Sequence, residues 1–161
     1  MPDEKTVFHG LDRLEIELPS WGFADTGTRF GKFLQDAAAI TLEDKLDDAA
    51  EVHRVTGCCP SVAVHVLWDF EDLADPGPSS DLARERGLRI GSINPNVFQD
   101  QCYRLGSVTN TDPAIRRRAI DHLLQSVEIG RAVGSDLVSL WFADGTNYRS
   151  EEHTSEFQSR Q

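Results

Sequence analysis

The chain has 161 residues, of which 39% are hydrophobic and 27% charged, so its size and composition predict one globular domain with a sizeable core. The formal net charge of −11 argues against nucleic acid as a partner, because a phosphate backbone would be repelled. No run approaches the ~18 apolar residues of a membrane span, and we expect no signal peptide and no membrane partner. The odd set of three cysteines, two of them adjacent, favours reduced thiols and a cytoplasmic protein.

The first half of the chain alternates strand and helix patterns. Residues 1–13 are polar and predict only a short lead-in. Residues 13–23 alternate apolar and charged side chains before a proline, which predicts a strand that runs into a loop. Residues 41–57 predict a helix, with Thr41 as its N-cap and a glycine as its stop. Residues 61–70 form a nearly continuous apolar run rich in valine, which is typical of a strand buried on both faces.

The second half continues the alternation. Residues 80–87 predict a short helix, and residues 88–96 predict the next strand, which a proline interrupts. The clearest helix covers residues 112–134, because Asp112 suits the N-cap, a proline suits the first turn, and an apolar stripe repeats with helical spacing. Residues 136–145 then predict a fourth buried strand.

Strands that alternate with helices predict a parallel α/β sheet with right-handed crossovers. Two architectures fit this order, namely a doubly wound sheet and half of a (β/α)8 barrel. Each predicted strand ends in a loop with polar and aromatic residues, as on the functional face of a barrel. The sequence contains neither the dinucleotide-binding glycine motif nor a P-loop, so binding of nucleotide phosphates has no support.

Aromatic and polar side chains gather where the predicted strands end. In chain order the candidates are Trp21, Phe30, His65, Asp69, Asn94, Asn96, Trp141 and Asp144. This mixture suits a sugar, whose C–H face packs on aromatic rings while its hydroxyls form hydrogen bonds. Asp69 can accept a hydrogen bond from the imidazole of His65, which would fix its tautomer. Each residue taken singly also has an alternative interpretation as a core residue, most strongly the histidine and the tryptophans.

Four stretches, taken together, are more specific than any single residue. They are ELPSWGFADTGTRFGKF, VAVHVLWDF, RIGSINPNVFQDQCYRLGS and LVSLWFADGTNY. Over residues 11–148 they resemble the start of the bacterial L-rhamnose isomerases of the Pseudomonas type, within the xylose isomerase-like TIM-barrel superfamily. The resemblance implies the N-terminal half of a (β/α)8 TIM barrel, with four parallel strands and crossover helices, in a domain over residues 1–148.

The resemblance also implies an activity, the interconversion of an aldose and a ketose, with L-rhamnose and L-rhamnulose as the pair and a divalent metal, usually manganese, as cofactor. Trp21 in PSWGF and Phe30 in GTRF match the apolar wall of the family's sugar pocket. His65 in VHVLWD matches the histidine that faces the sugar, and it is the candidate catalytic residue. Trp141 in LWFADG matches the tryptophan that flanks the substrate. The family's metal ligands lie on later strands, so we expect none in this chain.

Residues 149–161 depart abruptly from the resemblance and instead look like a translated sequencing-library adapter, so we expect an artefactual tail. On this interpretation the chain is an N-terminal fragment of an enzyme that we expect to be a homo-oligomer. Alone, the fragment would self-associate through its open sheet edges and would have negligible isomerase activity. Two alternatives remain open: another xylose isomerase-like activity, such as that of a ketose 3-epimerase, and a non-catalytic α/β binding module.

Overall fold

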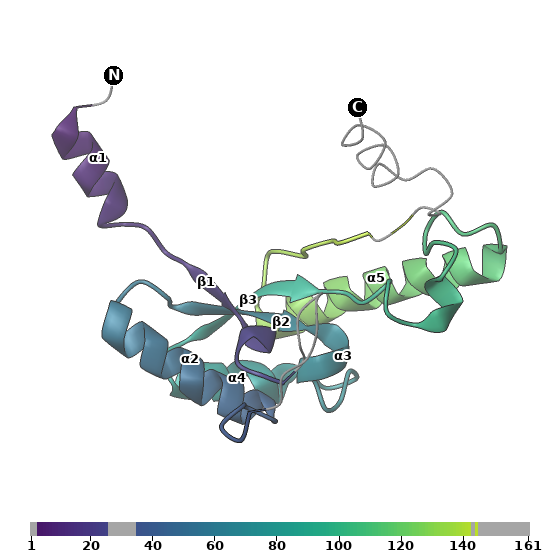
Figure 1. Cartoon of the computed structure of the whole chain (residues 1–161), viewed down its shortest axis with the longest axis horizontal. Helices are drawn as coiled ribbons and strands as arrows, with labels where there is room; N and C mark the ends of the chain where they lie inside the picture. The colour runs from purple at the N-terminus through teal and green to yellow at the C-terminus, as the bar shows by residue number, and fades with distance from the viewer. Residues whose placement is uncertain (1–2, 26–34, 143, 145–161) are drawn as a thin grey trace, which may run out of the picture.

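A computed structural model describes residues 3–25, 35–142 and 144, and it shows a parallel β-sheet with helices packed against it (Figure 1). In chain order the elements are α1 (Glu4–Leu11), β1 (Glu17–Pro19), the 3-10 helix η1 (Ser20–Gly22), α2 (Leu42–Thr56), β2 (Ser61–His65), α3 (Val66–Asp69), α4 (Gly77–Glu85), β3 (Arg89–Asn94), the 3-10 helix η2 (Gln101–Tyr103) and α5 (Pro113–Val133).

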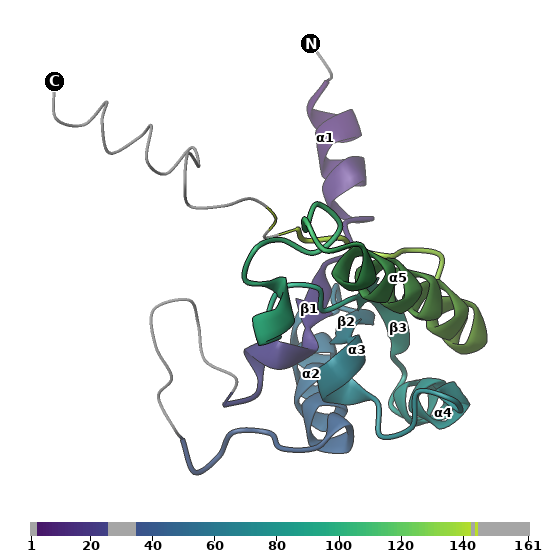
Figure 2. The ribbon, with the colours of Figure 1, turned by 90° about the vertical axis from the view of Figure 1, so that its right-hand side faces the viewer.

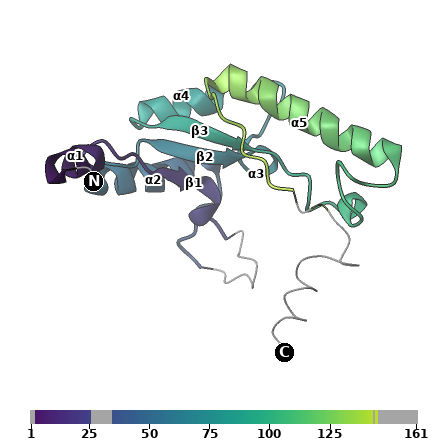
Figure 3. The same ribbon diagram turned by 90° about the horizontal axis from the view of Figure 1, so that it is seen from above.

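The three strands lie in the order β1-β2-β3, and both pairs are parallel (Figure 3). Helix α2 contacts α4, and α4 contacts α5, so the crossover helices follow one another around the sheet (Figure 2). Every residue of β2 is buried, as its apolar run predicts for a central strand. Because the strands are parallel, their carboxyl ends lie at one edge, where His65 pairs in register with Asn94.

The two long helices begin and end where the sequence predicts. Thr41 accepts a hydrogen bond from the backbone of Asp44, whose carboxylate accepts in return from Thr41, and Gly57 ends α2 with a φ of 72°. Asp112 accepts a hydrogen bond from the backbone of the first turn of α5, and Gly134 ends that helix with a φ of 77°. These caps satisfy backbone groups that a helix end leaves without partners.

The main core lies between the sheet and helices α2, α4 and α5. Its buried members are Leu46, Ala49, Val62, Val64, Val66, Phe70, Ala83, Leu88, Ile90, Ile93, Ile129 and Val133. Burial of each large side chain of this kind contributes about 1.5–3 kcal/mol. A second, smaller core of Val97, Tyr103 and Ala119 packs the loop after β3 on α5. The carboxyl ends of β2 and β3 therefore stand on a closely packed base.

The predicted strand over residues 61–70 is wrong in its second half. Strand β2 ends at His65, and α3 turns the chain through one helical turn. The carboxylate of Asp69 accepts a hydrogen bond from the backbone N–H of His65 at 2.6 Å, so that N–H bonds to the turn. A continuous apolar run cannot distinguish these two conformations by its periodicity. The next helix also begins earlier than predicted, at Gly77.

The structure shows three strands in the described sheet, where the sequence predicts four. The segment that carries Val138 makes only an isolated bridge to Ile93, with backbone hydrogen bonds of 2.9 Å from Ile93 to Leu137 and 2.8 Å from Ser139 to Ile93. It thus lies beside β3 as a partial fourth member of a TIM-barrel-like arrangement. Residues 143 and 145–161, with the predicted tail 149–161, lie outside the described residues.

The lead-in predicted for residues 1–13 contains a helix that the sequence analysis does not predict. Residues Glu4–Leu11 form α1, which Asp3 caps by accepting a hydrogen bond from Thr6 at 2.7 Å. None of its residues is buried, and the helix stands away from the sheet (Figures 1 and 2). Among the helices of the described residues, none is long and apolar enough to cross a membrane.

Candidate functional site

Three of the four predicted site residues lie at the carboxyl edge of the sheet. Trp21 lies in η1, directly after β1, and His65 is the last residue of β2. Trp141 follows the bridge at Val138 and is 55% exposed. The fourth, Phe30, lies outside the described residues. The parallel order of the strands is what brings these distant positions to one edge.

Trp21 and His65 share a cluster with two aromatic rings that the sequence did not single out. The imidazole of His65 stacks on Trp68 with ring centroids 3.6 Å apart and planes at 14°. Trp21 meets His65 edge to face at 6.1 Å, and Phe98 meets it from another side, also at 6.1 Å. Phe98 in turn contacts Trp141 at 4.5 Å, so the five rings form one continuous aromatic cluster.

His65 is the polar centre of this aromatic cluster. The residue is 4% exposed, and neither ring nitrogen has a hydrogen-bond partner among the described residues. Burial lowers the pKa of the imidazole to about 4; Asp69 opposes this shift, whereas His122 and Lys45 add to it. At neutral pH the ring is therefore uncharged, with one nitrogen able to donate a hydrogen bond and the other able to accept one.

The predicted contact between Asp69 and the imidazole is wrong. The carboxylate instead accepts from the backbone N–H of His65, from the hydroxyl of Ser20 at 2.5 Å and from the ammonium of Lys45 at 2.7 Å. It reaches the backbone because α3 folds Asp69 back beneath the end of β2. Asp69 thus provides no hydrogen bond to either imidazole nitrogen.

The two asparagines at the end of β3 hold backbone rather than a ligand. The amide of Asn94 donates to the carbonyl of Val64 at 3.1 Å, and the Oδ1 of Asn96 accepts from the backbone N–H of Gln99 at 3.1 Å. The backbone N–H of Asn96 donates to Nε2 of His122 at 3.0 Å. Burial lowers the pKa of His122 and so favours the neutral ring that accepts this bond. These contacts hold the loop that carries Phe98.

Asp144 holds the segment that carries Trp141. Its carboxylate accepts from the backbone N–H of Ser107 at 2.7 Å, from the hydroxyl of Ser107, and from the backbone N–H of Thr109 at 2.9 Å. Partial burial raises the pKa of Asp144, but these hydrogen bonds outweigh it, and the net pKa is lowered. The residue acts as an anchor in the described structure.

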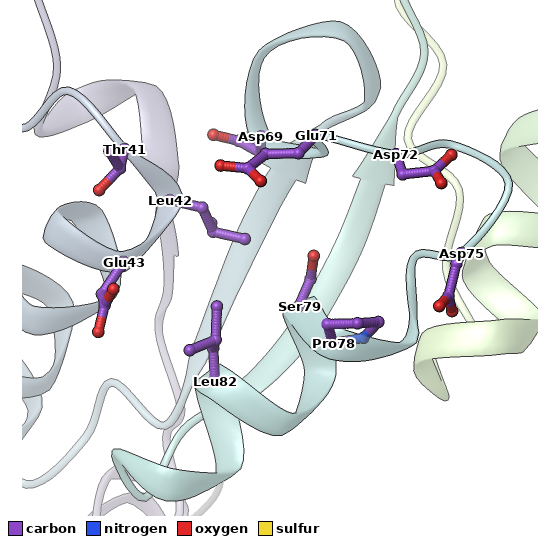
Figure 4. Close-up of a pocket in the computed structure, with 10 residues that line it drawn as sticks. All are labelled: Thr41, Leu42, Glu43, Asp69, Glu71, Asp72, Asp75, Pro78, Ser79 and Leu82. Carbon is purple, nitrogen blue, oxygen red and sulfur yellow. The ribbon is translucent and has the colours of Figure 1, made fainter.

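A pocket of about 410 Å³ opens between the starts of α2 and α4 (Figure 4). Its lining residues are Thr41, Leu42, Glu43, Asp69, Glu71, Asp72, Asp75, Pro78, Ser79 and Leu82. The carboxylates of Glu43, Glu71, Asp72 and Asp75 are spread around this pocket and do not converge on one point (Figure 4). Across residues 3–25, 35–142 and 144, no group of three or more His, Cys, Asp or Glu could hold a metal ion. The aromatic cluster is therefore the better candidate site.

The sequence of the chain is similar to those of several known proteins. No protein-family model matches the chain. It is 36% identical over 143 residues to a probable sugar isomerase of Rhizobium meliloti (strain 1021), and 33% identical over 143 residues to one of Mesorhizobium japonicum. Each alignment covers 86% of this chain and 33% of the relative. A 57-residue stretch is 28% identical to a xylose isomerase of Thermus thermophilus, covering 35% of this chain and 15% of that enzyme.

The chain is thus similar over most of its own length to proteins named probable sugar isomerase, and over a shorter stretch to a xylose isomerase. The chain spans about a third of the length of the two rhizobial relatives. The three-stranded parallel sheet with its helices is consistent with a partial TIM-barrel-like fold.

Proposed function

We propose that this chain supplies the sugar-binding side of an isomerase that interconverts an aldose and a ketose, with L-rhamnose and L-rhamnulose as the pair. The observation that carries the proposal is the buried imidazole of His65, whose ring nitrogens have no partner among the described residues. Buried polar atoms in folded proteins are nearly always hydrogen-bonded, so a ligand hydroxyl would complete this site. The similarity to proteins named probable sugar isomerase supports the class of ligand.

The chemistry of the aromatic cluster fits a sugar. A pyranose or an open-chain sugar presents C–H groups that pack on the rings of Trp21, Trp68 and Phe98, which exclude water. The neutral imidazole can donate to one hydroxyl oxygen and accept from another hydroxyl, because burial keeps the pKa of His65 far below neutral. Its role is to bind and orient the sugar, and a proton held at its donor nitrogen would remain there at neutral pH.

The family resemblance implies a divalent metal, manganese, that polarises the sugar carbonyl when it is bound. The described residues do not fit this group, since they contain no cluster that could hold a metal ion. We therefore assign no step of the reaction to a metal, and propose that this chain alone has negligible isomerase activity.

The first test is titration of the chain with L-rhamnose while the ring signals of His65 are followed by NMR. His65→Phe keeps a ring that can stack on Trp68 but removes both nitrogens. We expect the dissociation constant to rise about tenfold, which corresponds to one lost hydrogen bond. Phe8→Ala, on the exposed helix α1, is the matched control and should leave the constant unchanged. Equal affinity in the unaltered chain and H65F would contradict the proposal.

A second experiment tests which sugar the chain binds and whether the chain alone catalyses the isomerisation. Tighter binding of a 2-ketohexose than of L-rhamnose would favour the ketose 3-epimerase alternative. Incubation of the chain with L-rhamnose and manganese chloride should give no conversion above background. Conversion that a chelator abolishes would show that this chain holds a metal centre, and would overturn the proposed division between sugar binding and catalysis.

A further inference from the structure

The carboxylate of Asp69 joins three elements of the fold directly beneath the aromatic cluster. It accepts from Ser20, the first residue of η1, and from the backbone N–H of His65 at the end of β2. It also pairs with Lys45 from α2 at 2.7 Å. Ser20 adjoins Trp21, and Asp69 adjoins Trp68, so each of the three rings nearest the sheet stands at or beside a residue of this network.

The network is buried almost completely. The side chains of Lys45 and Asp69 are 3% and 0% exposed, and Ser20 is 0% exposed. Lys45 has a second acceptor, the carbonyl oxygen of Trp68, at 3.4 Å. Transfer of two charges from water into such surroundings offsets much of their mutual attraction, so an apolar pair of similar volume often gives equal or greater stability. Net stability alone therefore does not account for this pair.

We infer that Lys45 and Asp69 form a positioning pair, which sets the relative placement of His65, Trp21 and Trp68 for the sugar. Two oxygens of one carboxylate fix three donors whose directions differ, so η1, the end of β2 and α2 cannot shift independently. Lys45 holds the carboxylate in place from α2 and also contacts the carbonyl of Trp68. The inference that the pair serves sugar binding rests on the proposed function. The effect of the pair on the placement of the rings can be tested without a sugar.

An outer ion-pair group offers a contrast within the same molecule. Arg86 follows α4 and pairs with Asp47 at 2.5 Å and Glu43 at 2.8 Å, both on α2. Its acidic partners are 62% and 60% exposed. These ion pairs also join separate elements, and among the described residues neither of them includes a member of the aromatic cluster. Arg86→Met is therefore a matched control, since it removes an ion pair of α2 away from the proposed site.

The test combines two variants of the network with that control. The double variant K45M/D69L replaces the pair by apolar side chains of similar volume and removes the acceptor for Ser20 and His65. Ser20→Ala keeps the ion pair and removes only the bond to η1. Ring proton shifts are measured by NMR, because the stack at 3.6 Å places His65 in the ring current of Trp68. L-rhamnose is then titrated into each variant.

We expect K45M/D69L to move the His65 ring signals toward those of an unstacked histidine and to weaken L-rhamnose binding about tenfold. S20A should move the Trp21 signals while the His65 signals stay in place. R86M should change neither. Folded variants whose ring signals match the unaltered chain would overturn the inference. If K45M/D69L does not fold, S20A decides, since unchanged Trp21 signals in that variant would overturn it as well.

The sugar titration separates this inference from the proposed function. Ring signals that move in the variants, in a chain that binds no L-rhamnose at all, would support the positioning pair and contradict the proposed function. Sugar binding that is equal in the unaltered chain and in both network variants, with unchanged ring signals, would support the site and contradict the positioning pair.

Discussion

Two carboxylates anchor the two sides of the aromatic cluster, and they do so by different means. Asp69 is buried, and its three donors come from three elements of the fold, one of them a charged ammonium. Among the described residues, Asp144 accepts from Ser107 and Thr109, which belong to one loop and are neutral. The first anchor is part of the packed core, whereas the second ties an edge segment to a neighbouring loop.

The aromatic rings beside the two carboxylates differ in their burial. His65 is 4% exposed and stacked on its neighbour, while Trp141 is 55% exposed. The stability of the fold depends strongly on both members of a buried ion pair. If one member is removed, the other stays buried, and no water is present to replace the lost contact. Neutral donors near the surface can return to water at a smaller cost. We therefore expect the two sides of the site to differ in stability by several kcal/mol.

The largest expected effect comes from Asp69→Ala, which leaves Lys45 buried without its carboxylate. Loss of one partner of a buried pair costs about 3–5 kcal/mol, so the midpoint of urea unfolding should fall strongly. Asp75→Ala, an exposed acid of the neighbouring pocket, is the matched control and should change the free energy of unfolding by less than about 0.5 kcal/mol. Similar effects of the two substitutions would show that Asp69 is no more strongly coupled to the fold than an exposed acid.

The next effect is the dependence of stability on pH through His65. The folded chain keeps this ring neutral down to a pKa of about 4, whereas the unfolded chain protonates it near 6.5. Between these values the unfolded state binds more protons, so stability is fully present above pH 6.5 and falls as the pH drops toward 4. The loss should reach up to about 3 kcal/mol, at 1.36 kcal/mol per pKa unit.

Urea unfolding at several pH values measures this loss, and His65→Phe supplies the reference. The variant should show a flatter profile between pH 6.5 and 4, with a remaining slope from His122, whose pKa is also lowered by burial. Identical profiles for the unaltered chain and H65F would show that the imidazole is not held in an apolar environment.

The fold was largely predictable where local signals agreed with one another. Helix α5 carries an acidic N-cap, a proline in its first turn and a glycine stop, and its bounds match the prediction within one residue. The run after Ser61 differs from its predicted strand in its second half, because an apolar segment fits a buried strand and a buried helical turn equally well. The segment around Val138 was predicted as a strand from composition, but strand assignment also requires a continuous partner.

The sequence points to Trp21, His65 and Trp141, which the structure brings to one edge of the sheet, but it does not point to Trp68, to Phe98 or to the residues that support the cluster. Trp68 lies three residues after His65, a spacing that places both on one side only if the intervening residues form a helical turn. Lys45 had a signal that was missed, since it lies three residues after Leu42 on the inward stripe of α2, where a charge requires a buried partner. The partner, Asp69, comes from another element, and sequence spacing does not reveal contacts of that kind.

A smaller effect is expected at the second anchor. Asp144→Ala removes the acceptor of Ser107 and Thr109, and the loss of these hydrogen bonds should cost about 1–2 kcal/mol. The effect should be local, with faster hydrogen exchange at the backbone N–H of Ser139 and unchanged exchange within β2. Faster exchange throughout β2 would show that the two anchors belong to one cooperative unit and would remove the distinction between them.

The smallest expected effect on stability comes from an ion pair that has the same length as the Lys45–Asp69 pair but is exposed to water. Arg131 and Glu128 on α5 pair at 2.7 Å, the distance of the Lys45–Asp69 pair, but their side chains are 72% and 68% exposed. Water screens this pair and competes for both groups, so Glu128→Gln should change the free energy of unfolding by less than about 0.5 kcal/mol. Urea unfolding of E128Q beside D69A then compares two ion pairs of equal length in different surroundings. An effect of E128Q as large as that of D69A would mean that the attraction between the charges, and not their burial, sets the strength of the Asp69 anchor.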